Sequence, residues 1–182
     1  MEETKILNKL TKYVPETVAE RILYLTKLAE KNNILSLFTS MGDYVIDLNL
    51  IVTKEVTVWT PELITINLND ITTEAPNIER TEQITEYTEE ELEMFNKLVK
   101  YLESEHAQRI IYLMRLAKEN DITYLFASLY EGNDQYIRVS IHQNWIKIYM
   151  GEEPPLNGKY QSTKEWLDEM DRNIDTRITI FR

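Results

Sequence analysis

The chain has no cysteine, only four glycines and only two histidines among its 182 residues, and each scarcity excludes a class of protein. Without cysteine there can be no disulfide, no thiolate nucleophile and no cysteine-bound zinc or iron–sulfur centre. The glycines, at positions 42, 132, 151 and 158, are too dispersed for a dinucleotide-binding fingerprint or a phosphate-binding loop. We therefore expect no cofactor.

The two histidines, His106 and His142, do not have the spacing of a metal site. The acidic residues near the carboxyl end lack the pattern of a calcium-binding loop, and a solvated helix face explains them as well. We expect no metal ion and no catalytic residue, and we favour a non-catalytic protein. The sequence leaves one enzymatic alternative open, in which His106 or His142 acts as a general acid or base in cleaving RNA.

Long apolar runs are also missing, so the sequence offers no segment that could span a membrane. The chain starts with Met-Glu-Glu-Thr-Lys, which has neither the basic start nor the apolar stretch of a secretory signal. These features predict a protein without membrane association, located in the cytoplasm. The 43% of hydrophobic residues is enough to bury a real core.

What the sequence does have is an internal repeat. Residues 8–41 recur at 96–129 with a constant offset of 88 and no gap. The identical pairs include Leu25/Leu113, Leu28/Leu116, Leu37/Leu125, Phe38/Phe126, Arg21/Arg109 and Tyr24/Tyr112. The repeat predicts a tandem duplication with pseudo-two-fold symmetry: a first lobe over 1–70, an acidic linker over 71–88 and a second lobe over 89–182.

Each repeat is expected to be α+β, with two helices followed by a small antiparallel sheet. Apolar residues at helical spacing predict a helix over 17–32, and Thr88 with Glu91 forms a capping-box pair before the corresponding pair of helices. Glycines and alternating apolar residues predict strands over 34–41, 44–52, 55–59, 122–130, 135–143 and 145–150. An extra strand over 63–68 is expected in the first copy alone, whereas the second copy ends with a helix over 162–172 and a strand over 177–181.

The shared apolar positions are predicted to form the core. The shared Arg21/Arg109 and Tyr24/Tyr112 pairs have two interpretations. Each arginine could extend from the edge of the apolar stripe to a nearby carboxylate while each tyrosine buries its ring, or the pairs could form two equivalent surface sites.

The net charge of −11 is concentrated in two segments. Residues 71–91 hold seven acids and one base, and residues 152–175 hold seven acids and three bases, which together account for ten negative charges. Such runs either keep a surface solvated or meet a basic cleft on another protein. Direct binding to nucleic acid is disfavoured, because it needs clustered Lys and Arg.

Under the second interpretation the partner-binding residues are the acids of both segments together with two aromatic residues near the second one. Aromatic anchors ringed by charge are typical of binding hot spots. The predicted protein-binding residues are Glu74, Glu79, Glu82, Glu86, Glu89, Glu90, Tyr160, Glu165, Trp166, Asp168 and Glu169. The protein itself is expected to be a monomer or a homodimer.

A small, cysteine-free, strongly acidic chain rich in Lys, Glu, Asn and Ile resembles the phage-encoded anti-CRISPR proteins that inhibit Cas9. The residues carrying this likeness of overall character are the acidic stretch Glu74–Glu91 and the acidic helix Glu165–Asp171. The resemblance implies an inhibitor, acting in the host bacterial cytoplasm, that docks on Cas9 or its guide RNA complex and blocks target DNA recognition or cleavage. An immunity protein that neutralises a basic nuclease toxin is the alternative with the same electrostatics.

Overall fold

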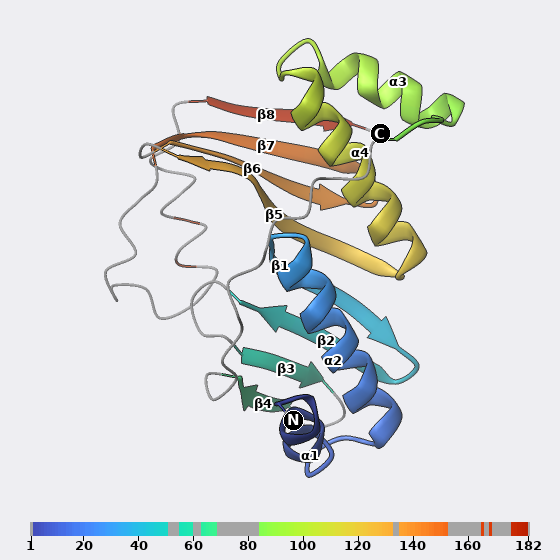
Figure 1. The fold of residues 1–182 in the computed structure, drawn as a ribbon, viewed down its shortest axis with the longest axis vertical. Helices are drawn as coiled ribbons and strands as arrows, with labels where there is room; N and C mark the ends of the chain where they lie inside the picture. Colours follow the sequence, from blue (N-terminus) through green and yellow to red (C-terminus); the bar gives the residue numbers. More distant parts are fainter. Residues whose placement is uncertain are drawn as a thin grey trace.

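The computed structural model describes residues 2–50, 55–59, 63–68, 84–132, 135–152, 165, 168 and 176–181. Within these residues the chain is α+β, with four helices and eight strands in one antiparallel sheet. The order of elements is two helices, four strands, two helices and four strands. Figure 1 shows the first six elements below the last six, with the sheet running continuously through both halves.

The helices are α1 (Glu2–Leu10), α2 (Glu16–Lys31), α3 (Glu89–Leu98) and α4 (Ser104–Glu119). Their apolar residues recur every three or four positions, so that α2 buries Val18, Ile22, Leu25 and Ala29 on one stripe. α1 packs on α2 and α3 packs on α4. The predicted helix over 17–32 and the predicted second pair of helices are therefore present.

The strands are β1 (Ile34–Met41), β2 (Tyr44–Asn49), β3 (Glu55–Trp59), β4 (Leu63–Asn67), β5 (Ile122–Gly132), β6 (Gln135–His142), β7 (Trp145–Glu152) and β8 (Thr176–Phe181). Their order across the sheet is β4-β3-β2-β1-β5-β6-β7-β8, and each strand pairs antiparallel with its neighbours in this order. A tight turn at Gly42 and Asp43 joins β1 to β2, where Gly42 adopts the left-handed φ of 59° that glycine tolerates best.

The two halves meet where β1 pairs with β5 at the centre of the sheet. Leu37 lies opposite Leu125 and Phe38 lies opposite Tyr124, with irregularities in register on both sides of this stretch. Leu37 and Leu125 are fully buried. The sequence could not say whether the halves share a sheet; the pairing joins them into one.

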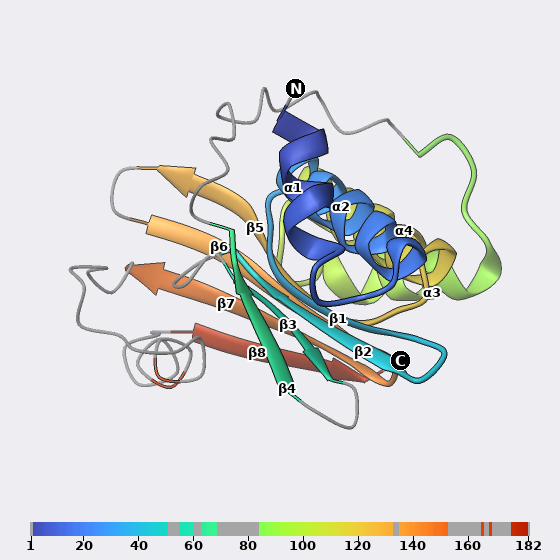
Figure 2. The same cartoon turned by 90° about the horizontal axis from the view of Figure 1, so that it is seen from below.

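All four helices cover the same face of this sheet, as Figure 2 shows. Alternate strand residues point toward the helices and make up the main core, which includes the identical pairs Leu25/Leu113 and Leu37/Leu125. The prediction that the shared apolar positions form the core is confirmed for these pairs. Phe126 is also fully buried, whereas Phe38 is only partly buried.

Two arginines connect the halves across the helical layer. Arg21 of α2 donates from Nη2 to the backbone carbonyl of Asn120, the residue that caps the end of α4. Arg109 of α4 donates from Nη2 to the backbone carbonyl of Asn32, the residue that caps the end of α2, over 2.8 Å. The expectation that these arginines reach carboxylates was wrong. Carbonyls at the carboxyl end of a helix lack partners within the helix and carry partial negative charge, so a guanidinium satisfies them.

Each of these arginines also lies over the tyrosine three residues further along its helix. The guanidinium carbon of Arg21 is 5.6 Å from the ring centroid of Tyr24, and that of Arg109 is 5.2 Å from Tyr112. The Tyr24 hydroxyl donates to Oδ1 of Asn120 over 2.8 Å. The shared Arg and Tyr residues therefore help to join the two halves.

Each half ends in a fourth strand at an edge of the sheet, whereas we expected the two halves to end differently. β4 pairs with β3 at one edge of the sheet, and β8 pairs with β7 at the other, so the fourth strand is not confined to the first copy. The divergent stretch before β8 concealed this correspondence. The predicted helix over 162–172 lies outside the described residues, apart from Glu165 and Asp168, which are helical.

Truncation at the central junction should destabilise the whole protein. We expect Leu37→Ala and Leu125→Ala each to lower the free energy of unfolding by about 3 kcal/mol, because each leaves a cavity in a packed core. The double variant should lose less than the sum, since the two side chains are neighbours. Urea unfolding followed by circular dichroism measures both effects. Leu63→Ala, at a side chain that is 68% exposed, is the control. If the free-energy losses of the two single leucine variants simply add up to that of the double variant, the contact between the two side chains is contradicted.

Candidate functional site

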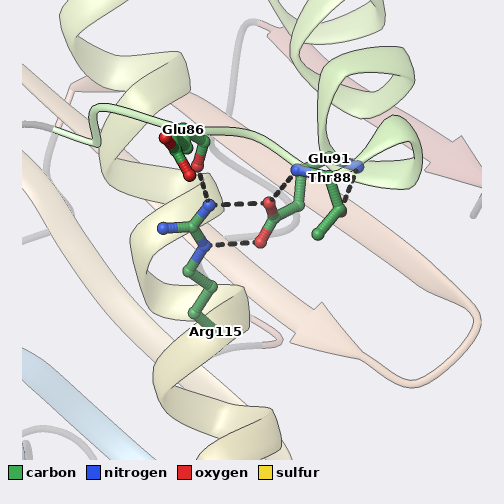
Figure 3. Close-up of polar contacts among 4 residues, drawn as sticks. All are labelled: Glu86, Thr88, Glu91 and Arg115. Atoms are coloured by element: carbon green, nitrogen blue, oxygen red, sulfur yellow. Dashed lines mark hydrogen bonds and ion pairs between the residues drawn. The ribbon is translucent and has the colours of Figure 1, made fainter.

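The start of α3 is fixed to α4 by one arginine, shown in Figure 3. Arg115 donates from Nε to Oε1 of Glu91 over 2.5 Å and from Nη2 to Oε2 of the same carboxylate over 2.7 Å. Its Nη2 also donates to the backbone carbonyl of Glu86. This two-pronged pairing matches the planar fork of a guanidinium to a carboxylate, which makes it both strong and directional. We call these three residues the Arg115 clamp.

The carboxylate of Glu91 serves the helix start at the same time. The backbone N–H of Thr88 donates to Oε2 of Glu91 over 2.7 Å, and the backbone N–H of Glu91 donates to the Thr88 hydroxyl over 3.3 Å. The predicted capping box is therefore confirmed. The hydrogen bond from Arg115, assisted by that from Thr88, lowers the pKa of Glu91 to about 2, against the opposing effect of burial.

The other acids at this helix start remain at the surface. Glu86, Glu89 and Glu90 are exposed. Glu86 contributes only its backbone carbonyl to the Arg115 clamp, and Glu89 and Glu90 lie between Glu86 and Glu91 in sequence. We call these three residues the α3 acidic surface. Tyr87, between them, is partly buried and its ring lies 5.4 Å from Phe95, so residues 84–88 pack against the protein over part of their length.

The remaining predicted binding residues are placed only in part. Glu165 and Asp168 are exposed. Six others lie outside the described residues, namely Glu74, Glu79, Glu82, Tyr160, Trp166 and Glu169. The structure therefore brings together the acids at the start of α3, and it neither joins nor separates them from the second acidic segment.

A groove of about 610 Å³ adjoins the α3 acidic surface. Its walls come from α3, from the end of α4, and from the adjoining ends of β1, β5 and β6. The lining residues are Ser40, Glu90, Met114, Ala117, Lys118, Asp121, Ile122, Thr123, Ile141, His142 and Gln143. The described lining therefore combines four apolar residues with seven polar or charged ones, so it offers more hydrogen-bonding and charged groups than apolar surface.

The structure places His142 at this groove, on β6. Its ring stacks on the ring of Trp145 in β7, with the two centroids 3.4 Å apart. On the other side of β6, the ring centroid of Tyr124 in β5 lies 4.6 Å from that of His142. Burial, followed by the charge of Lys147, lowers the pKa of His142 to about 4. His142 is therefore neutral near pH 7.

His106, the other histidine, lies in the first turn of α4, away from the groove lining. Within the described part of the chain, no three His, Asp or Glu side chains come together as a metal site could require. The arrangement at the groove therefore offers hydrogen-bonding and charged groups for binding.

The face of the sheet without helices carries further ionisable groups. On adjacent strands, Asp47 and Tyr124 lie on either side of Phe38. Burial raises the pKa of both Asp47 and Tyr124, and the Ser140 hydroxyl opposes this for Tyr124. Toward the edges, Trp59 is 50% exposed, whereas Tyr149 is buried.

Sequence reasoning missed the Arg115 clamp, although the repeat contained its signal. In the first half Lys27 pairs with Glu3 over 2.6 Å, and these positions are 88 residues before Arg115 and Glu91. Both halves therefore tie the start of the first helix to the second helix at the same positions. The side chains of Lys27 and Glu3 are 48% and 63% exposed, whereas the Glu91 side chain is only 13% exposed.

Comparison of this chain with protein-family models, with curated proteins and with solved structures found no match. Among the described helices, none combines the length and the apolar character needed to cross a bilayer.

The Arg115 clamp should make the free energy of unfolding depend on pH in the acid range. Because the pKa of Glu91 is about 2 when folded and near 4.5 when unfolded, its contribution should be complete above pH 4.5 and lost as the pH falls toward 2. We expect Glu91→Gln to lower the free energy of unfolding by about 2 kcal/mol at pH 7. Urea unfolding at pH 7 and at pH 2.5 measures this, and the difference from the unsubstituted protein should shrink at the lower pH.

The matched control is Glu3→Gln, which removes the equivalent ion pair in the first half. Because both of its partners are well exposed, we expect no resolvable change in the unfolding midpoint. Equal destabilisation by the two variants at pH 7 would contradict the special role of the buried carboxylate.

The state of His142 can be read directly by NMR. We expect its ring protons to titrate with a pKa of about 4, and Lys147→Met to raise this pKa without restoring the ordinary value of 6.5, since burial is the larger cause. A His106→Asn background leaves one histidine signal to follow. A ring that titrates at 6.5 in the unsubstituted protein would contradict the burial seen at this site.

Proposed function

We propose that this protein is a non-catalytic, acidic binding protein that acts in the cytoplasm and blocks a basic, nucleic-acid-handling bacterial defence enzyme. The Cas9–guide RNA complex is the partner to test first, as the resemblance to anti-CRISPR proteins implies. The observation that carries the proposal is the α3 acidic surface, in which Glu86, Glu89 and Glu90 are exposed beside the Arg115 clamp.

The Arg115 clamp matters because it fixes where those charges lie. Arg115 binds the carbonyl of Glu86 and the side chain of Glu91, so the backbone before and within the first turn of α3 is tied to α4 at two points. Charges on a fixed backbone lose less entropy on binding than charges on a mobile one. With a net charge of −11, the chain would also attract a basic partner over several ångströms and speed its association.

We also propose that the chain is a tandem duplication whose halves are related by pseudo-two-fold symmetry. Three structural correspondences at the offset of 88 support this. They are the reciprocal bonds of Arg21 and Arg109, the ion pairs of Lys27 and Arg115, and the left-handed backbone of Asn33 and Asp121, with φ of 51° and 50°. In this proposal the second copy carries the binding surface.

The test compares two triple variants with the same change in charge. Glu86→Gln, Glu89→Gln and Glu90→Gln together neutralise the α3 acidic surface, while Glu16→Gln, Glu20→Gln and Glu105→Gln neutralise exposed acids on α2 and α4. Both sets include acids in the first turn of a helix, so their effects on helix stability are similar. Affinity for the Cas9–guide RNA complex is measured by biolayer interferometry over a range of salt concentrations.

We expect the first triple variant to bind at least tenfold more weakly and to show a flatter salt dependence, and the second to stay within about threefold of the unsubstituted protein. Binding instead to a basic nuclease toxin, included in the same panel, would identify the immunity-protein alternative. Equal effects of the two triple variants on every partner bound would overturn the proposed surface.

A further inference from the structure

We infer that the groove beside the α3 acidic surface is an anchor pocket for an arginine side chain of a basic partner protein. The inference rests on the proposed function and specifies where the partner is gripped. Its basis is that Glu90 belongs both to the acidic surface and to the lining of the groove.

The apolar lining residues suit the aliphatic part of such a side chain. Met114 and Ala117 of α4 line it from one side, and Ile122 of β5 and Ile141 of β6 line it from another. The (CH₂)₃ stem of an arginine packs well against apolar surface while its charged head stays near polar groups. A lysine stem would fit too, but the planar guanidinium can bind a carboxylate with two hydrogen bonds at once.

The polar lining residues supply the acceptors. Glu90 and Asp121 bring two carboxylates, and Ser40, Thr123 and Gln143 bring neutral oxygens. Among the lining residues that the structure describes, Lys118 is the one cation, so the two carboxylates outnumber it and an anionic ligand is disfavoured.

Two sets of contacts hold the backbone that carries Glu90 and Asp121. The Arg115 clamp positions the start of α3 and hence Glu90. The backbone carbonyl of Asp121 accepts a hydrogen bond from the Thr39 hydroxyl over 2.7 Å, which ties the turn after α4 to β1. A pocket whose backbone is already held in place needs less ordering when it binds, as expected of an anchor site.

The direct test is a ¹⁵N NMR titration of the intact protein with N-acetyl-L-arginine methylamide. We expect the shift changes to concentrate on the lining residues, among them Asp121, Thr123 and Gln143. The matched probe is N-acetyl-L-citrulline methylamide, which has nearly the same shape without the charge, and it should cause at most a fifth of the shift at equal concentration. Equal shifts from both probes, or changes scattered over the surface, would overturn the inference.

The second test uses partner binding and avoids residues of the α3 acidic surface. Asp121→Asn keeps a residue that tolerates the left-handed backbone at this position, where φ is 50°. Asp43→Asn makes the same chemical change at an exposed turn in the first half. We expect Asp121→Asn to weaken partner affinity about tenfold and Asp43→Asn to change it by less than twofold. Equal affinities of these two variants would overturn the inference.

The two proposals fail in different ways. If the α3 triple variant loses affinity while Asp121→Asn behaves like Asp43→Asn, the acidic surface binds and the groove does not. If no partner depends on the α3 acidic surface, the proposed function fails, and the two-probe titration still decides whether the groove takes a guanidinium.

Discussion

The antiparallel pairing of β1 with β5 is the constraint on which the rest of the structure depends. An unpaired first strand in either half would expose a row of backbone donors and acceptors, which is a template for aggregation. Because the two strands pair with each other, both halves share a single sheet and a single helical layer. The reciprocal bonds of Arg21 and Arg109 then fasten the helix ends above the junction, where they satisfy carbonyls that the helices leave without partners.

The same construction leads to the candidate site. Because α4 lies on the sheet, its Arg115 can bind the start of α3 and hold it against α4. The turn after α4 places Asp121 next to the end of β1. The groove therefore forms where elements of both halves meet; among its described lining residues, Ser40 comes from the first half and the others from the second. Its position follows from the topology, whereas its charges follow from a few residues.

Much of the fold could be predicted from the sequence, because helix and strand periods and the repeat are local or internal signals. The bounds of β1 and β3 agree with the structure, and so does the capping box at Thr88 and Glu91. The sequence could not show that β1 pairs with β5, since pairing between distant strands leaves no local pattern. The destination of Arg21 was missed for a related reason: a backbone carbonyl is an acceptor at every residue, so no residue type marks it.

The reciprocal contacts at the centre have the geometry of an isologous interface, in which residue i of one copy meets residue j of the other and the reverse. On the duplication that we propose, a single unit could have formed this junction with a second copy of itself as a homodimer. Covalent linkage makes that association independent of concentration. It also frees the two copies from having to remain identical, so that one keeps the exposed pair of Lys27 and Glu3 while the other carries the Arg115 clamp beside the groove. A symmetric dimer would have to present every surface twice; the joined chain presents this one once.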